Sequence, residues 1–437
     1  MAAITVPSSM SLSVRSWSHS HEHRLVSHGR HGRHQPRPSR LAPRASVSAP
    51  LKTAGRVMSK GDPGAWDDGG LGTPVVRFYL SEGREQWYMW HSGHSTEDDP
   101  GVDALFPGSG SVGLAVSQDG LRWQRSMEAV TGERGAPATS DVGRVLGPNA
   151  EAWWSFDTRH ISVSDVQILG DSQGGRSDAG VYWMFTAGGS QEEAPLPPRL
   201  ARLLGAGAGE LTKGWRTQPG LAMSPNARVW ARIETSDEPS GTVLPVGQSG
   251  EWDAHFIAGP QVVAAGPNDL RMYYYSWDEG LGRFVIGLAR SEDGFRWKKT
   301  GPIFQGGEGH DAAGATAHCV VQDLDSRAFF MFYEAVAADN TRSIGLAVSP
   351  DGLGDWQRTP DPILQAGGEG AWDEGSVGAP WPVSMAAGRW RLYYAGRRAG
   401  RQGGAWEGVG CALSVPDTPA FLRAPLHFKR AAVAGAA

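Results

Sequence analysis

The chain has 437 residues, two cysteines and a formal net charge of −5 at pH 7. This charge gives no basic field for nucleic acid, and no apolar run is long enough to span a bilayer. We therefore expect neither nucleic acid nor a membrane as a partner. Two cysteines are too few for a disulfide framework, so we expect Cys319 and Cys411, both in predicted strands, to be buried thiols.

The N-terminal segment differs in composition from the rest of the chain. Residues 1–46 contain one acidic residue, Glu22, against seven arginines, and they are rich in serine without a continuous apolar stretch. This composition is typical of organelle transit peptides and not of secretory signals. The opening Met-Ala-Ala and the Ser-rich, Pro-containing stretch resemble chloroplast transit peptides. We therefore predict that residues 1–46 are disordered and are removed in the chloroplast.

After residue 60, one short motif recurs five times. An aromatic residue or histidine precedes an aspartate in Trp66-Asp67, Phe156-Asp157, Trp252-Asp253, His310-Asp311 and Trp372-Asp373. A spacing of 7 residues to a proline recurs from Asp67 to Pro74, Asp253 to Pro260 and Asp373 to Pro380. A spacing of 22 residues recurs from Trp66 to Tyr88, Trp252 to Tyr274 and Trp372 to Tyr394. Five copies of one unit predict a repeat architecture.

Each unit is predicted to contain four short strands. In the first unit, residues 73–76 begin the first strand, the aromatic residues 87–90 belong to the second, and residues 112–116 form the third. Residues 117–123 then contain an Asp-Gly pair, which predicts a tight turn because glycine accepts a positive φ and aspartate bonds its own backbone. A fourth strand leads to the next aspartate. Aromatic second strands recur at residues 182–185, 273–275, 330–333 and 393–394, and the turn recurs at 291–297 and 349–356.

The predicted fold is all-β: a five-bladed β-propeller with four antiparallel strands per blade, over residues 62–430. The expected blades are about residues 62–147, 148–245, 246–305, 306–365 and 366–430. The 60 glycines and 29 prolines suit a chain that is dense in turns, and no segment has the long apolar period of a core helix. A β-sandwich is the alternative, but a sandwich would not repeat a 22-residue spacing.

These motifs resemble those of the five-bladed propeller glycosidases, which include arabinanases, xylosidases, invertases and levansucrases. The resemblance rests on the aromatic–Asp start, the aromatic second strand, and the pattern Ile/Val-Gly-Leu-Ala-x-Ser-x-Asp-Gly-x-x-Trp, and it covers about residues 62–430. The turn is also similar to the Asp box of sialidases, so a six-bladed propeller is the alternative within this group. The count of five Asp-led units favours five blades.

The resemblance implies three carboxylates at the mouth of the central channel. These are a nucleophile or base on the first blade, a supporting aspartate on the second and a glutamic acid further on. The chain departs from the family motifs, because it reads Ala-Trp-Asp-Asp-Gly-Gly from residue 65 and Ser-Asp-Val from residue 164 in place of the usual Asp-Pro motifs. Neither Glu-Gly-Pro nor Glu-Cys is present. These differences fall in the motifs that carry the family's catalytic carboxylates. They therefore bear on whether this protein hydrolyses a glycosidic bond at all.

Strand direction separates two faces of the predicted propeller. The loop that enters the first strand lies on the same face as the loop between the second and third strands, here called the entry face. The Asp-Gly turns lie on the opposite face, here called the turn face. A residue that recurs in every blade serves the blade, so we expect the five repeated aspartates to be structural and to accept backbone N–H groups. The site is expected on the entry face, among residues that break the repeat.

Glycoside hydrolysis requires two carboxyl groups, about 5 Å apart for retention and about 6.5–9.5 Å apart for inversion. The predicted catalytic residues are Asp68, Asp165, Glu334 and Glu374. The predicted substrate-binding residues are Arg159, His160, His255, Trp277 and Arg397. No cofactor is predicted, and the weak alternative is a divalent metal near His160, His255 and His318, which belong to three successive blades.

Two functions are compatible with the sequence. The resemblance implies a plastid glycoside hydrolase or transglycosidase of the arabinanase–invertase type, with a small carbohydrate ligand at the channel mouth. The alternative is a catalytically inactive propeller that serves as a binding or scaffold module. The first function requires that carboxyl groups on the entry face converge on one sugar, and the second requires that they do not.

Overall fold

A computed structural model describes residues 53–81, 84–98, 101–102, 105–106, 108–126, 141–168, 180–207, 209–234, 238–323, 326–400, 406–415 and 426–432. Over these residues the protein is nearly all β, with one α-helix, α1 (Pro198–Leu204), and a 3-10 turn, η2 (Ala386–Gly388). No helix in the described part is long and apolar enough to cross a bilayer. The predicted transit peptide, residues 1–46, lies outside the described residues and stays a prediction.

Three sheets contain four antiparallel strands each. The first contains β7 (His160–Ile168), β8 (Tyr182–Gly189), β11 (Thr217–Ser224) and β12 (Ala231–Arg232). The second contains β13 (Ala258–Gly266), β14 (Asp269–Asp278), β15 (Arg283–Ser291) and β16 (Lys298–Phe304). The third contains β17 (Ala315–Gln322), β18 (Phe329–Val336), β19 (Arg342–Ser349) and β20 (Gln357–Arg358). A separate two-stranded sheet, β9 (Glu193–Pro195) and β10 (Leu211–Lys213), lies between β8 and β11 in the chain.

A ten-stranded sheet consists of two further groups of strands. One group contains β2 (Gly70–Ser81), β3 (Arg84–His94), β4 (Ser111–Ser117), β5 (Gln124–Arg125) and β6 (Arg144–Leu146). The other contains β21 (Ser376–Met385), β22 (Arg389–Arg397) and β23 (Trp406–Ser414), and β1 (Arg56–Ser59) and β24 (Phe428–Arg430) both pair with β23. One parallel residue pair, Leu71 with Glu407, joins the two groups. The five sets of strands are named here by their first strands as the β2, β7, β13, β17 and β21 groups.

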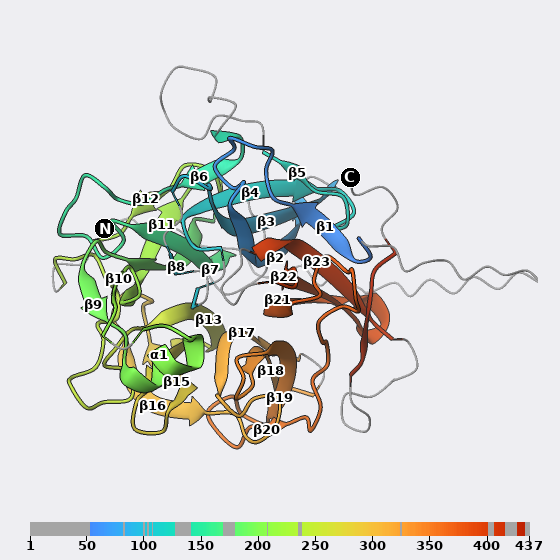
Figure 1. The fold of residues 1–437 in the computed structure, drawn as a ribbon. Helices are drawn as coiled ribbons and strands as arrows, with labels where there is room; N and C mark the ends of the chain where they lie inside the picture. The colour runs from blue at the N-terminus through green and yellow to red at the C-terminus, as the bar shows by residue number, and fades with distance from the viewer. Residues whose placement is uncertain are drawn as a thin grey trace, which may run out of the picture. The chain divides into compact units, whose positions relative to one another are not determined.

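The first strands of the five groups are neighbours in a closed series. β2 contacts β7, β7 contacts β13, β13 contacts β17, β17 contacts β21, and β21 contacts β2. In Figure 1 these five strands surround the centre of the part of the protein that the structure describes. Within each group the other strands lie beyond the first strand, on the side away from the centre. A residue on the inner edge of a first strand therefore lies close to the common axis.

Side chains of the first or second strands join each group to the first strand of its neighbour, since no ladder in the described sheets pairs one first strand with another. The contacts are Val163 N to Ser92 Oγ (3.0 Å), Val262 N to Asp165 Oδ2 (3.0 Å), Val320 N to Gln261 Oε1 (3.1 Å), Ala379 N to Glu334 Oε2 (3.0 Å) and Trp381 Nε1 to Val76 O (2.8 Å). Each of the five junctions has one. These contacts satisfy backbone groups that the ladders leave unpaired.

Each repeated aspartate is buried and forms an ion pair with a basic residue of an outer strand in its own group. The pairs are Asp67–Arg125 (2.7 Å), Asp157–Arg232 (2.8 Å), Asp253–Lys299 (2.7 Å), Asp311–Arg358 (3.3 Å) and Asp373–Arg430 (2.8 Å). The aspartates are therefore structural, as predicted, but their main partners are cations. An entry-turn amide, that of Gly307, also donates to Asp311, at 3.1 Å.

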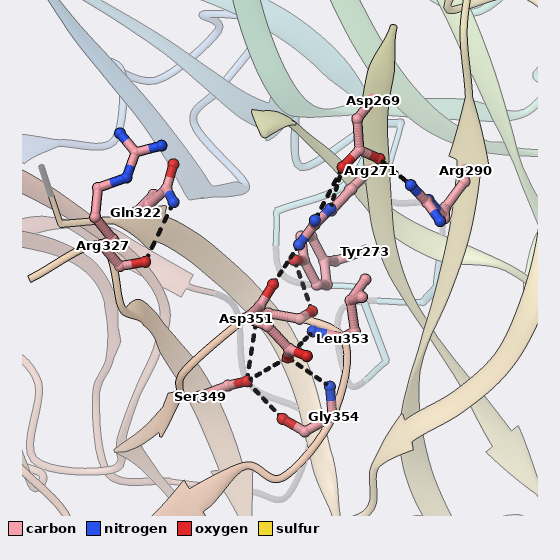
Figure 2. A network of polar contacts seen from close by, with 11 residues as sticks. Asp269, Arg271, Tyr273, Arg290, Gln322, Arg327, Ser349, Asp351, Leu353 and Gly354 are labelled. Carbon is pink, nitrogen blue, oxygen red and sulfur yellow. Dashed lines mark hydrogen bonds and ion pairs between the residues drawn. The ribbon is translucent and has the colours of Figure 1, made fainter. Parts of the chain in front are cut away.

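Each Asp-Gly turn on the turn face is held by hydrogen bonds within the turn and by a contact from the neighbouring group. In the turn after β19, Tyr273 of the preceding group donates to the Gly352 carbonyl at 2.9 Å (Figure 2). Arg271, which pairs with Asp269 at 2.9 Å, donates to the carbonyl of Asp351. The same arrangement recurs where Arg391 and Tyr393 donate to the carbonyls of Asp119 and Gly120. Because these contacts recur, they serve the scaffold.

The β7 group contains the same turn with different residues. Asn226 replaces the aspartate, and Ala227, at φ 65°, replaces the glycine. The Asn226 Oδ1 atom accepts the backbone N–H of Val229 at 3.0 Å, and the Trp230 indole donates to the Ala227 carbonyl at 3.2 Å. The sequence did not predict this turn, because an Asn-Ala pair lacks the strong Asp-Gly signal.

The two ends of the described chain meet on β23. β1 pairs with β23 through residues such as Met58, which lies opposite Val409, and β24 pairs with it further along. The Gly55 amide donates to the Ala431 carbonyl at 3.0 Å, which links the two end segments directly. The β21 group therefore depends on both ends. Its β23 also contains Cys411, and both cysteines are buried free thiols, as predicted.

Candidate functional site

The predicted site, at the axis on the entry side, is a narrow cavity. All five first strands line it, with Thr73, Ser162, Gly259, His318 and Ala379 as one residue from each. Its volume is about 50 Å³, and no carboxylate is among its lining residues in the described part of the chain. A water needs at least about 10–15 Å³ of such volume, so the cavity holds a few waters but not a sugar ring.

Asp165 lies in β7 and is fully buried. It pairs with Arg77 Nη2 at 2.7 Å and accepts from Gln167 Nε2 at 2.6 Å and from the Val262 amide at 3.0 Å. A carboxylate has about four lone-pair sites. Asp165 therefore uses most of its acceptor capacity within the scaffold, and it links strands of three groups.

Glu334 lies in β18 and is also fully buried. It binds the guanidinium of Arg342, accepts from Thr316 Oγ1 at 3.0 Å and accepts the Ala379 amide at 3.0 Å. A Cβ atom on Gly378 would lie 2.0 Å from Glu334 Oε2, so glycine is required for this close approach. Glu334 thus holds the β21 strand against the β17 group.

Asp68 and Glu374 occupy equivalent positions, each directly after a repeated aspartate. Asp68 accepts the amides of Gly64 at 2.7 Å and Thr96 at 2.8 Å, and Glu374 accepts the amide of Gly370 at 2.8 Å. We expected both residues to break the repeat, but they close the same entry turn in two groups. The hydrogen bonds to Gly64 and Thr96 also hold the pKa of Asp68 below its usual value, which does not suit a proton donor.

Two predicted substrate-binding residues are core residues. His160 is buried, its Nε2 lies 2.7 Å from the Gly214 carbonyl, and burial lowers its pKa to about 4. Trp277 is buried and its indole N–H donates to Glu279 at 2.7 Å. Both side chains are directed into the protein, so the prediction that they contact a ligand finds no support in this geometry.

His255 and Arg397 are half-buried in separate groups. The His255 ring lies 6.1 Å from the Trp215 ring, and burial lowers its pKa. Arg397 donates to Ser376 Oγ at 3.1 Å and lies over the Trp406 ring. In the described part of the chain, no three His, Cys, Asp or Glu residues are placed to hold a metal ion, so His160, His255 and His318 do not form the metal site considered as an alternative.

Arg159, the remaining predicted binding residue, lines a polar hollow of about 530 Å³ on the entry face. The hollow lies between the β2 and β7 groups, and His94, Glu97, Asp98 and Arg144 also line it. A second hollow of about 440 Å³ shares Ala150, Thr158 and Gln191 with the first. The two hollows therefore adjoin, and together they are here called the entry groove.

Two tryptophans at the outer end of the entry groove, Trp153 and Trp154, were not among the predicted site residues. The sequence contained a signal for them. In three units the repeated aspartate is preceded by glycine, one other residue and tryptophan, in that order. In the β7 group Trp154 stands at the position of the glycine. Comparing only the residues after each aspartate misses this break in the repeat.

A further hollow lies at the other end of the channel. It has a volume of about 870 Å³ and is lined by the distal parts of the first strands, including Val262, Val320 and Trp381. Its charged Arg77 already pairs with Asp165. Among the described residues its lining is mainly apolar, and Asp323, half-buried at the rim, is the one carboxylate that lines it.

Comparisons with known proteins identify the fold. No protein-family model and no curated protein matches the chain. Among solved structures, the BT0996 RGII complex has a TM-score of 0.55 at 18% identity, over 86% of this chain and 95% of its own. A thermostable family-43 glycoside hydrolase has a TM-score of 0.55 at 14% identity, over 84% of this chain and 96% of its own. The chain has the fold of the β-propeller glycosidases. At these identities the likeness concerns the fold, so the chemistry of this propeller must be argued from its own residues.

Proposed function

We propose that this protein is a five-bladed β-propeller with four strands per blade, located in the plastid, that binds a small carbohydrate without hydrolysing it. The closed series of first strands supports five blades, as do the five aspartate–cation pairs, one in each group. In the β21 group, β1 and β24 together take the place of the fourth strand. The composition of residues 1–46 supports the plastid location.

The use of the buried carboxylates within the scaffold carries the non-hydrolytic part of the proposal. A general acid or nucleophile must approach the glycosidic oxygen or the sugar carbon with an open lone pair or a mobile proton. Asp165 and Glu334 instead bind an arginine each and the backbone of a neighbouring group. The axial cavity beside them is also too small for a sugar ring.

Two observations support a carbohydrate as the ligand. The fold is that of proteins that act on carbohydrates, and the entry groove is polar and of a size common for ligand sites, about 300–1,000 Å³. The groove is lined by both acidic and basic side chains, which suits a ligand with many hydroxyl groups and no net charge.

The test uses purified protein that begins at residue 47. Linear arabino-, xylo- and fructo-oligosaccharides would be titrated by calorimetry, and the same mixtures would be assayed for newly formed reducing ends. We expect saturable binding of at least one of these neutral sugars and no release of reducing ends. Release that is lost in a folded Glu334→Gln variant would overturn the non-hydrolytic proposal, and the absence of binding to any of the sugars would overturn the carbohydrate proposal.

A further inference from the structure

Two adjacent tryptophans lie exposed on the entry turn of the β7 group. Trp153 is 83% exposed and Trp154 is 50% exposed, whereas most of the aromatic residues in the second strands are buried. The centroids of the two rings are 6.0 Å apart, and the ring planes are nearly perpendicular, at 89°. The edge of one ring therefore faces the other, and the open ring faces are left to solvent. Exposed apolar side chains that are adjacent on a surface commonly mark a binding site.

The fold does not require tryptophan at this turn. The equivalent position is glycine in three other groups, at Gly64 (φ 88°), Gly250 (φ 94°) and Gly370 (φ 78°). The turn closes with the same hydrogen bond, because Ser155 N donates to the residue three before it at 2.7 Å, as Ala65 N does at 2.9 Å. Trp154 itself, unlike the three glycines, does not have a positive φ. One group thus presents two adjacent aromatic side chains, where the three others present a glycine preceded by Pro63, Ser249 or Glu369. Packing does not explain this difference, because the rings extend into solvent.

The turn that carries the tryptophans is firmly anchored. Asp157, three residues after Trp154, is buried and pairs with Arg232 at 2.8 Å. Asn149 N donates to the Asp157 carbonyl at 3.0 Å and closes the turn from the other side. The tryptophans are therefore presented on a rigid support, which reduces the conformational entropy that a ligand must remove on binding.

The entry groove continues from the tryptophans into a polar interior. Gln191 and Gln218 line it beside the indole rings, and Asp98 and Arg159 line its inner end between the β2 and β7 groups. Amide, carboxylate and guanidinium groups are planar and bind pairs of neighbouring hydroxyls. A sugar ring has a C–H face and a rim of hydroxyls, so the aromatic faces and planar polar groups match its two kinds of surface.

The alternatives fit these residues less well. A nucleic acid needs a basic surface, but Glu97, Asp98 and Glu192 line this groove together with Arg144 and Arg159. An apolar protein partner or an acyl chain that covered the groove would bury these polar groups without hydrogen-bond partners. The mixed charges also give no preference for an acidic sugar.

We infer that the entry groove is the carbohydrate site and that it binds a neutral oligosaccharide, with Trp153 and Trp154 in contact with the face of a sugar ring at its outer end. This inference rests on the proposed carbohydrate-binding function and adds the location and the class of sugar. It places the ligand away from the propeller axis, between two blades, where the hollow is large enough for more than one sugar unit.

The experiment compares Trp153→Ala and Trp154→Ala with Leu281→Ala. Leu281 is a suitable control because it is an exposed apolar residue, 53% exposed, in the loop after β14 of a different group. Each protein would be titrated with neutral arabino-, xylo- and fructo-oligosaccharides, with calorimetry and tryptophan fluorescence as readouts. We expect both tryptophan variants to bind at least about tenfold more weakly, and Leu281→Ala to bind like the unchanged protein. The fluorescence change on saturation should be smaller in each single variant than in the unchanged protein.

Melting temperatures and a third variant separate binding from folding. All the tryptophan variants should melt close to the unchanged protein, because the rings are exposed, and Gln218→Ala provides a second test inside the groove. Undiminished sugar binding by the Trp153→Ala/Trp154→Ala double variant would overturn the inference and leave the proposed function intact. Absence of sugar binding by the unchanged protein would instead overturn the proposed function, and with it the inference. Tighter binding of uronic-acid oligosaccharides than of neutral ones would overturn the assignment to neutral sugars.

Discussion

Arg77 and Asp165 form an ion pair of 2.7 Å between β2 and β7, and the same carboxylate accepts an amide from β13. One side chain therefore connects three of the five groups. Asp165 was predicted as a catalytic residue because it breaks the sequence repeat, but its contacts show that such a break also occurs where the scaffold needs a specific link.

Asp165→Asn should lower the free energy of unfolding by about 2–3 kcal/mol, since the neutral amide leaves Arg77 without its charge partner. Urea unfolding followed by intrinsic fluorescence measures this change. Glu374→Gln is the control, because Glu374 accepts one turn amide near the surface, and it should cost less than about 1 kcal/mol. Equal unfolding midpoints for the two variants would show that Asp165 is not a structural link.

Asp293→Ala should lower the free energy of unfolding by about 1 kcal/mol. Its Oδ1 atom accepts the amides of Phe295 and Arg296, both at 2.9 Å, on the turn face. Carbohydrate binding should not change, since the entry groove lies on the opposite face. The measurements are thermal unfolding and calorimetric titration of the same preparation, and a weaker affinity at unchanged stability would contradict this separation of the faces.

The stability of the protein should fall as the pH falls from about 6.5 toward 4. Burial lowers the pKa of His91 to about 3 and the pKa values of His160 and His318 to about 4. In the unfolded chain a histidine has a pKa of about 6.5. Between these values the unfolded state binds more protons, so each histidine contributes up to about 1.4 kcal/mol of lost stability per pH unit.

Urea midpoints between pH 7.5 and 5 test this dependence. His318→Asn removes one of the three groups, so its midpoints should fall less steeply with pH, whatever its stability at pH 7.5. An unchanged slope in this variant would mean that His318 titrates normally in the folded protein.

Protein that begins at residue 61 should be less stable than protein that begins at residue 47, by roughly 3 kcal/mol or more. The shorter form lacks β1, in which Val57 and Met58 are buried, and each fully buried side chain of this size contributes about 1.5–3 kcal/mol. Urea unfolding of the two forms provides the comparison. Equal midpoints would show that β1 is dispensable for closing the β21 group.

Residues 1–46 fused to a fluorescent reporter should direct it to chloroplasts. The physical basis is the excess of arginine over acidic residues without an apolar segment. Microscopy with a chloroplast autofluorescence reference gives the location, and the reporter alone is the control. A reporter that stays in the cytosol or is secreted would contradict the prediction.

Features that depend on nearby residues could be predicted from the amino-acid sequence. The five aspartates, the aromatic strands and the Asp-Gly turns recur at fixed spacings, so the all-β class, the repeating order and the structural role of the aspartates could be predicted. Even the cations that bind the aspartates follow a local rule, because Arg125, Lys299 and Arg358 each stand two residues after a turn tryptophan. Short-range signals of this kind require no knowledge of the rest of the fold.

Which of the unusual residues are available to a ligand depends on the folded arrangement of the strands and could not be predicted. Asp165 binds an amide 97 residues away and Glu334 one 45 residues away, and no local pattern reveals such partners. Trp153 and Trp154 were visible in the sequence as a break in the repeat, but so was Asp165. What separates them is burial, which is set by the packing of distant strands: the carboxylates face neighbouring groups at the axis, and the indole rings face solvent beside a groove.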